Sequence, residues 1–144
     1  MKRMICLFLM IFLLAFSVVP IYGSETRSLE KESIISPMFV HIHHIIPGLK
    51  IDSSGKATSL GVAGTYSSSH TINMNVELQK LSGSSWNTIK NWTASGPGYP
   101  SGVMLERDWY VVKGTYRVSV TVQVYDSFGR LLETQTASTS PRVY

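Results

Sequence analysis

Residues 113–133 read KGTYRVSVTVQVYDSFGRLLE, and this stretch decides the fold class. The even positions of 116–124 are apolar and the odd positions between them are polar. Strict alternation of this kind is typical of a β-strand that buries one face. The sequence DSFG over 126–129 predicts a tight hairpin turn whose glycine adopts a positive φ. We therefore expect a long strand over 115–125 and its hairpin partner over 131–138.

Tyr116 closely follows Gly114 at the start of this long strand. β-Sandwich domains often place a tyrosine at such a corner, where its hydroxyl bonds back to the backbone a few residues upstream. We predict a tyrosine corner at Tyr116, with the valines of 118–124 lining the inner face of the strand. The same stretch is then a scaffold, and a site is better placed in the loop around Tyr99 or on the polar odd-numbered face.

The chain from residue 38 onward is rich in Val, Ile, Thr, Tyr and Trp, and turn-forming residues interrupt it at short intervals, as in all-β domains. Over 57–66, Leu60, Val62 and Tyr66 share one face of the expected strand. Residues 95–102, SGPGYPSG, are expected to form a loop because they contain two prolines and three glycines. The remaining strands are expected over 38–45, 49–51, 57–66, 71–81, 86–94 and 103–112.

About seven strands without an amphipathic helix predict an all-β fold, a single antiparallel β-sandwich of immunoglobulin-like or fibronectin-like type. In such a sandwich each strand buries only its inner face, which agrees with the alternating pattern. A small β-barrel would give a similar pattern and is the alternative.

Residues 1–23 have the layout of a secretory signal peptide: a short basic start, an apolar run over 4–19, and a small residue, Gly23, at the end. This layout predicts export, with cleavage after Gly23. An uncleaved membrane anchor is the alternative, but the run is shorter than the ~20 residues of a spanning helix. We expect a flexible lead-in over 24–37 and one β-sandwich domain over 38–144.

The only cysteine, Cys6, lies inside the signal segment, so the mature domain is expected to fold without disulfides. An exported chain without cysteine suggests a bacterial exporter. The chain has 13 basic and 9 acidic residues, and removal of Lys2 and Arg3 leaves a net charge of about +2. The basic residues are scattered, which argues against nucleic-acid binding. We expect no membrane association after cleavage.

The succession VELQKLSGSSWNTIKNW over 76–92, a Gly-rich loop, the stretch over 113–133 and a Ser/Thr-rich tail are distinctive together. They resemble a family of small exported proteins of unknown function from Gram-positive bacteria. The resemblance covers residues 49–138 and implies a signal peptide followed by one β-rich domain. It implies no activity, cofactor or site residue.

Trp86 and Trp92 are six residues apart, so a regular strand would place both on one face. On an exposed face they would form an aromatic platform for sugar rings, whereas large aromatics more commonly belong to the core. Ile89 lies an odd number of residues from both tryptophans, so in a regular strand its side chain would face the opposite side. A bulge between the tryptophans would change which of these side chains share a face. We expect at least one of the two tryptophans in the core.

Tyr99 lies in the expected loop over 95–102, among glycine, proline and serine. Loops at the ends of sandwiches commonly carry function. Tyr99 is therefore either a plug over the end of the sandwich or a ligand contact.

Three of the four histidines lie in the sequence VHIHHI over 40–45. In a regular strand His41 and His43 point to the same side and could chelate a metal ion. Only His70 remains as a further histidine, and no local carboxylate completes the set. The alternative is an edge strand with solvated histidines, and we predict no cofactor.

Glu106 and Asp108 share a face of their expected strand, and paired carboxylates can hydrolyse glycosidic bonds. Ordinary cross-strand ion pairs with nearby basic residues explain them more simply. The sequence contains no catalytic motif of a known kind. We therefore expect a secreted, non-catalytic binding module for an unknown extracellular protein or cell-wall polysaccharide, with Tyr99, Trp92 and Trp86 as ligand contacts. A small secreted hydrolase and a secreted toxin or its antagonist are the alternatives.

Overall fold

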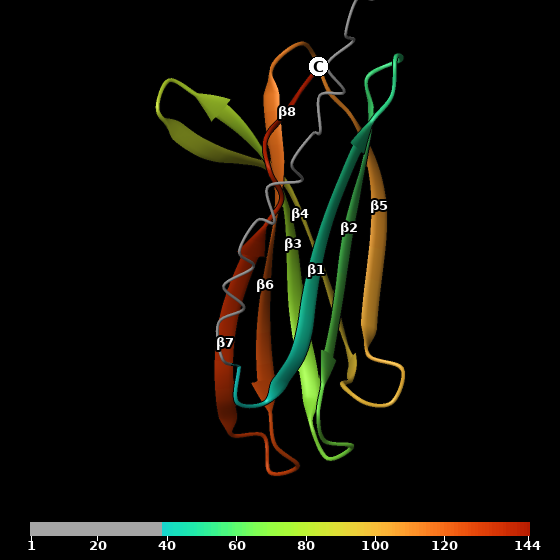
Figure 1. The fold of residues 1–144 in the computed structure, drawn as a ribbon, viewed down its shortest axis with the longest axis vertical. Coiled ribbons are helices and arrows are strands. Elements are labelled where there is room, and N and C mark those ends of the chain that lie inside the picture. Colours follow the sequence, from blue (N-terminus) through green and yellow to red (C-terminus); the bar gives the residue numbers. More distant parts are fainter. Residues whose placement is uncertain (1–38) are drawn as a thin grey trace, which may run out of the picture. The chain divides into compact units, whose positions relative to one another are not determined.

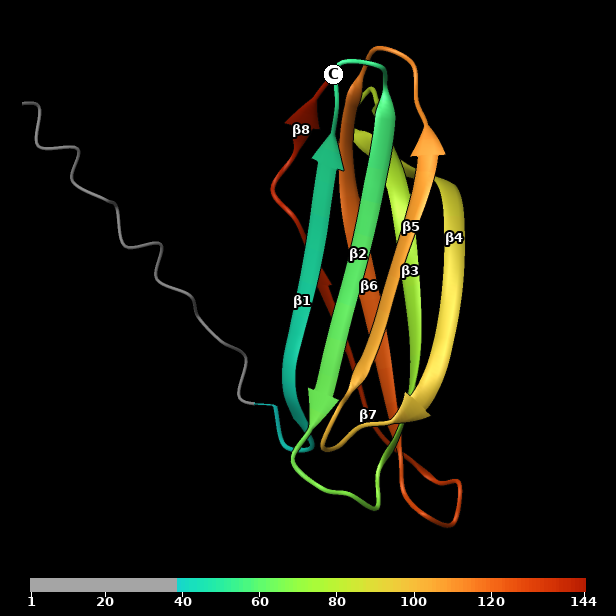
Figure 2. The same cartoon turned by 90° about the vertical axis from the view of Figure 1, so that its right-hand side faces the viewer.

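The computed structural model describes residues 39–144, so the predicted signal peptide and lead-in lie outside the described residues. These residues form an all-β fold of two antiparallel sheets packed as a β-sandwich, and the sheets do not close into a barrel (Figure 1, Figure 2). In this part of the chain no helix is long and apolar enough to cross a membrane. The strands are β1 (Ile42–Ile51), β2 (Lys56–Thr65), β3 (Thr71–Ser82), β4 (Ser85–Pro97), β5 (Val103–Tyr110), β6 (Thr115–Tyr125), β7 (Leu131–Ser138) and β8 (Arg142–Val143).

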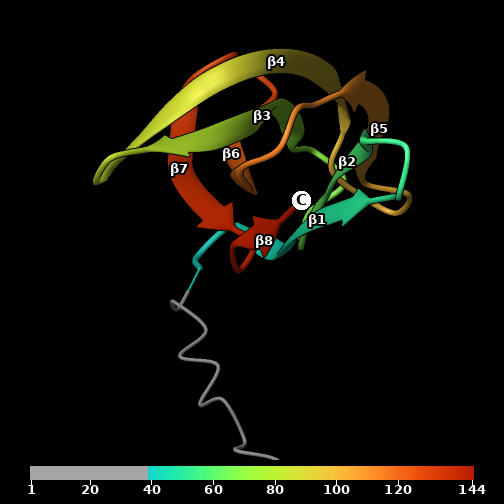
Figure 3. The ribbon, with the colours of Figure 1, turned by 90° about the horizontal axis from the view of Figure 1, so that it is seen from above.

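The first sheet has the strand order β1-β2-β5, and the second has the order β4-β3-β6-β7, with β8 also pairing with β6. Figure 3 shows the two layers from above, with the turn between β3 and β4 extending away from the sandwich. In a constant-type immunoglobulin domain the fourth strand joins the first, second and fifth. Here the fourth strand pairs with the third, so the strand order is the fibronectin-like one.

The central strand β6 has the bounds that the sequence predicts, and it pairs with β3 on one side and with β7 and β8 on the other. Its even-numbered side chains from Tyr116 to Val124 are buried in the core. The hydroxyl of Tyr116 donates a hydrogen bond to the carbonyl oxygen of Val112 at 2.7 Å, which confirms the tyrosine corner. Gly129 has a φ of 78°, which confirms the predicted turn after β6.

The two sheets contribute side chains of different size to the core. The inner face of β2 is made of the small residues Ala57, Ser59, Gly61 and Ala63, whereas β3 and β6 contribute Ile, Met, Leu, Val and Tyr. A Cβ atom on Gly61 would lie 2.6 Å from Val76 Cγ2, so the small residues let the sheets approach closely. The apolar face of β2 that carries Leu60 and Val62 points outward instead.

Two strands are longer than the sequence predicts, and both continue through a proline. β1 runs without a break through Pro47 and Gly48, which pair with β2. β4 continues through Ser95 to Pro97, which pairs with Thr71 of β3, so the loop is shorter than expected. Both are edge strands, where the missing N–H of proline can face away from the neighbouring strand.

The carboxylate of Glu133 on β7 links the two sheets at one edge. It accepts hydrogen bonds from the backbone N–H groups of Val40 at 3.4 Å, His41 at 2.7 Å and Ile42 at 3.2 Å. Burial raises the pKa of Glu133, but these hydrogen bonds outweigh it, so the net pKa lies below its usual value. The start of β1 is thereby held against β7.

Candidate functional site

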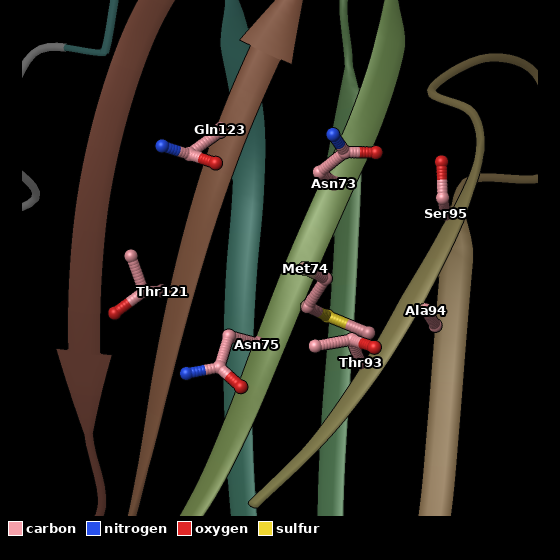
Figure 4. A pocket seen from close by; sticks show the side chains of 8 residues that line it. All are labelled: Asn73, Met74, Asn75, Thr93, Ala94, Ser95, Thr121 and Gln123. Carbon is pink, nitrogen blue, oxygen red and sulfur yellow. The ribbon is translucent and has the colours of Figure 1, made fainter.

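The outer face of the five-stranded sheet contains a shallow depression of about 420 Å³. Figure 4 shows that β3 and β6 supply amide side chains and that β4 and β6 supply hydroxyls. None of the lining side chains is charged, and the depression is open on its outer side. The lining residues are Asn73, Met74, Asn75, Thr93, Ala94, Ser95, Thr121 and Gln123.

Alternation and strand register bring these polar groups together. Inward-facing Ile72, Met74 and Val76 on β3 turn the asparagines between them outward. The pairing of Asn73 with Ser95 and with Gln123 then forms one polar row across β4, β3 and β6. The pairing of Asn75 with Thr93 and with Thr121 forms a second row beside it.

Two polar groups in the depression have no hydrogen-bond partner among the described residues. Thr121 Oγ1 lies 2.9 Å from Thr136 Oγ1, and Gln123 Oε1 accepts a hydrogen bond from Tyr125 at 3.2 Å. The amide nitrogen of Gln123 has no such bond, and Asn75 Oδ1 is buried without a partner within residues 39–144. A buried oxygen without a partner is costly, so a ligand hydroxyl or an ordered water would satisfy it.

A second group of polar and aromatic residues lies on the same outer face, toward the turn between β3 and β4. The guanidinium of Arg117 lies 4.4 Å from the ring centroid of Trp86, and its Nε donates to Gln79 Oε1 at 2.8 Å. Gln79 Nε2 in turn donates to Glu77 at 3.0 Å and to Thr88 at 3.3 Å. The guanidinium therefore covers part of the Trp86 ring that a sugar platform would need.

Trp92 does not share a face with Trp86. β4 carries a bulge at Ile89, because Lys90 pairs with Leu78 whereas Thr88 pairs with the next residue of β3. This extra residue reverses the alternation. Trp92 packs against the core, which confirms that at least one of the two tryptophans is a core residue.

Tyr99 lies in a different place, at the end of the three-stranded sheet. Its side chain is 51% exposed and lines a second depression of about 350 Å³ together with His43, His44 and Tyr66. Tyr99 is therefore not a buried plug. Its role as a ligand contact stays a prediction.

A bulge in β1 at His43 separates the two histidines that the sequence placed on one side. Ile42 pairs with Thr65 and His44 with Gly64, so one residue of β1 is extra. The ring of His41 packs edge-on against His70, with centroids 5.1 Å apart, whereas His43 Nδ1 lies 2.8 Å from His44 Nδ1. No group of three potential metal ligands converges among residues 39–144. The expectation that His41 and His43 point to the same side is therefore wrong.

Glu106 and Asp108 lie on the exposed outer face of β5. Asp108 forms an ion pair with Lys56 at 2.8 Å and accepts a hydrogen bond from Thr58 at 2.7 Å. The bond from Lys56, followed by that from Thr58, lowers the pKa of Asp108. Cross-strand pairing is thus confirmed for Asp108, and a lowered pKa is the opposite of what a general acid requires.

The sequence pointed to the loop around Tyr99 or to the polar odd-numbered face of the central strand, and the depression around Asn73 lies on that face. It did not indicate that Ser95 joins this face, because Ser95 was expected in the loop, nor that Thr93 of the expected strand over 86–94 faces the same way. The only signal in the sequence was the possible bulge at Ile89, which determines which side chains of the following part of β4 face outward. No protein-family model and no curated protein sequence matches the chain.

Proposed function

We propose that the protein is an exported, non-catalytic binding module that recognises a neutral polysaccharide through the outer face of its five-stranded sheet. The single observation that carries this proposal is the depression lined by neutral amides and hydroxyls, in which the buried Asn75 Oδ1 has no partner among the described residues. Sugar hydroxyls are both donors and acceptors, and side-chain amides and hydroxyls match them. A phosphate or carboxylate ligand would call for cationic side chains, which the depression lacks.

The shape of the depression supports an extended chain as the ligand rather than a small molecule. Pockets for small ligands are concave and mostly apolar, and they enclose most of the ligand. A shallow polar surface across three strands can instead contact successive units of a polymer. Neutral hydrogen bonds contribute about 1 kcal/mol each, so we expect weak binding, with a Kd of about 1 mM for a short oligosaccharide.

Export through a signal peptide cleaved after Gly23 is part of this proposal, since cell-envelope polysaccharides lie outside the cell. The resemblance to small exported proteins of Gram-positive bacteria supports this location. Mass spectrometry of the protein from the culture medium should find Ser24 as the first residue. An intact N-terminus in the cell pellet would contradict export.

The binding test is retention on purified cell wall and on an array of neutral glycans. Asn73→Ala and Gln123→Ala should each reduce retention several-fold, because each removes an amide from the depression. Asn87→Ala is the matched control, since Asn87 is an exposed amide of β4 outside the depression. Wild-type protein that is retained on neither material would overturn the proposal, and so would equal loss in the control.

A further inference from the structure

The outer face of the three-stranded sheet carries an exposed apolar row that no element within residues 39–144 covers. Ile46 of β1, Val62 of β2 and Met104 of β5 are direct neighbours in the strand register. Ile46 is 52% exposed and Met104 is 66% exposed. Leu60, two residues from Val62 along β2, extends the row on the same face. A contiguous apolar patch on a small domain commonly marks an interface.

The polar residues beside this row are arranged with opposite charge at the two edges of the sheet. Lys50 of β1, Thr58 of β2 and Asp108 of β5 form the next outward-facing polar row. Lys50 has no ion-pair partner among the described residues. Between the two rows, Gly48 on β1 lies at the same level as Glu106 on β5, with Leu60 between them. Asp108 is already paired with Lys56 of β2 at 2.8 Å, whereas Glu106 forms no ion pair in the part of the chain that the structure describes. One edge of the sheet therefore carries the unpaired Lys50, and the other carries the unpaired Glu106.

We propose that this face binds a second copy of the protein, with a two-fold axis parallel to β2 and over Val62. A rotation about this axis exchanges β1 with β5, so Ile46 meets Met104 of the other copy and Val62 meets Val62. The same rotation brings Lys50 beside Glu106 of the other copy, and it turns Lys56 toward Lys56 of that copy, each held by Asp108 of its own chain. The apolar row and the Lys50–Glu106 pair are thus self-complementary, as an isologous dimer interface requires.

The strand register sets what faces Glu106 across this interface. Glu106 meets Gly48 of the other copy, which the Leu60 side chain of that copy partly covers, and Lys50 of that copy lies beside it. A two-fold axis across the strands would instead place Ile46 against Ile46 and Met104 against Met104, and it would keep Lys50 away from Glu106 of the other copy. The register therefore favours the axis parallel to β2.

The size of the face sets the expected strength of the dimer. Three strands about 4.8 Å apart and about nine residues long form a face of roughly 14 by 30 Å. This area is about 420 Å² per copy, which in total falls below the roughly 1,000 Å² of a stable specific interface. We therefore expect a weak, transient dimer with a dissociation constant on the order of 0.1 mM.

The dimer would direct the two five-stranded sheets outward on opposite sides. If the depression around Asn73 and Gln123 binds polysaccharide, which is the function proposed above, the dimer would be bivalent and would link two chains. Bivalency raises retention on a polymer without any new contact. The dimer itself does not depend on that function.

Site-specific cross-linking tests the axis directly. In a full-length Cys6→Ser background, each introduced cysteine is the only one. Val62→Cys should give a covalent dimer with a short bismaleimide, whereas Thr121→Cys, on the outer face of the other sheet, should not. Ile46→Cys and Met104→Cys should each fail alone and cross-link when mixed. Cross-linking of Ile46→Cys alone, or equal cross-linking of Thr121→Cys, would overturn the proposal.

Sedimentation equilibrium provides a second measurement that needs no cysteine. Wild-type protein should dimerise with rising concentration, and Met104→Lys and Lys50→Glu should each weaken the dimer by at least about 10-fold. Asn91→Lys is the matched control, because it adds a charge to an exposed position of the other sheet. A wild-type protein that stays monomeric up to about 1 mM would contradict the dimer.

A mixture with polysaccharide separates this inference from the proposed function. Met104→Lys should bind each glycan unit like the wild type but should no longer make the mixture turbid. If the protein binds no glycan but still cross-links, the proposed function is rejected and the dimer is supported. If Met104→Lys leaves the turbidity unchanged, the dimer does not act as a bivalent link between polysaccharide chains.

Discussion

The hydroxyl of Tyr116 and the carbonyl oxygen of Val112 form a 2.7 Å hydrogen bond that ties the start of β6 to the segment that leads into it. The ring of Tyr116 is buried in the core. The bond therefore fixes the crossing from the three-stranded sheet to the five-stranded one at a single point.

Tyr116→Phe should retain the fold and lower the free energy of unfolding by about 1 kcal/mol, because it removes this bond and leaves the Val112 carbonyl unpaired. Urea denaturation measures the difference. Tyr125→Phe is the control, since the Tyr125 hydroxyl bonds only to a side chain, at 3.2 Å. An unchanged melting temperature in Tyr116→Phe would count against the corner.

Glu133 should make stability fall in acid. Burial raises the pKa of Glu133, but hydrogen bonds from the backbone N–H groups at the start of β1 outweigh burial, so its pKa in the folded protein is lowered. A Glu in the unfolded chain titrates near pH 4.3. The stabilisation is therefore complete above about pH 5 and is lost as the pH falls through the folded pKa. Glu133→Gln should be less stable at pH 7 by about 1–2 kcal/mol.

Denaturation of both proteins at several pH values checks this expectation. The difference between wild type and Glu133→Gln should shrink as the pH falls below about 5. Thr134→Val, at the neighbouring exposed position of β7, serves as the control because it changes no titratable group. A difference that stays constant with pH would exclude Glu133 as the titrating group.

Gly61→Ala should destabilise the sandwich by about 1–3 kcal/mol, because the added Cβ would lie 2.6 Å from Val76 Cγ2 and 3.2 Å from Met74 Sδ. Gly96→Ala is the matched control on β4. Its Cβ would meet Val103 Cγ2 at 3.4 Å, which is an ordinary contact. Thermal denaturation of both variants should show a large loss only for Gly61→Ala, and equal losses would reject the close approach of the sheets.

The bulge at Ile89 predicts unequal effects at the two tryptophans. Trp92→Ala should cost about 2–3 kcal/mol, because the ring packs against the core while remaining half-buried. Trp86→Ala should cost less than about 1 kcal/mol, the worth of its contact with Arg117. Chemical denaturation compares the two variants. The reverse order would place Trp86 in the core.

The imidazole of His44 should titrate below pH 6.5, because burial, followed by the charge of His43, lowers its pKa. The unfolded chain therefore binds a proton more readily, and this group reduces stability as the pH falls below about 6.5. NMR titration of the imidazole proton gives the pKa. His43→Gln should raise it, whereas His41→Gln should leave it unchanged, and a value unaffected by His43→Gln would exclude their interaction.

The sequence was informative where the relevant interactions are local. The bounds of β6 and β7 and the turn at Gly129 match the prediction, since alternation and a turn glycine are readable over a few residues. The bounds of β1 and β4 differ from the prediction, because a proline ends a central strand but can be accommodated in an edge strand. Pairing between distant segments decides which strands lie at an edge, and the sequence of one strand does not show this pairing.

The candidate site was likewise predictable where the signal is local and not predictable where it depends on strand pairing. The polar alternation of Asn73 and Asn75 on β3, and of Thr121 and Gln123 on β6, is visible in the sequence. Their assembly with Thr93 requires the register of three strands and the bulge at Ile89. The bulge at His43 explains why His41 and His43 do not share a side, and the bulge at Ile89 explains why the two tryptophans do not share a face.

The two prolines inside edge strands also bear on aggregation. An open sheet edge is a template for another chain, and a proline there removes a donor from the exposed ladder. Pro47 interrupts the edge of β1, and Pro97 ends that of β4. Each sheet is therefore protected against strand addition at one of its two edges, which leaves β5 and β7 as the edges where another strand could pair.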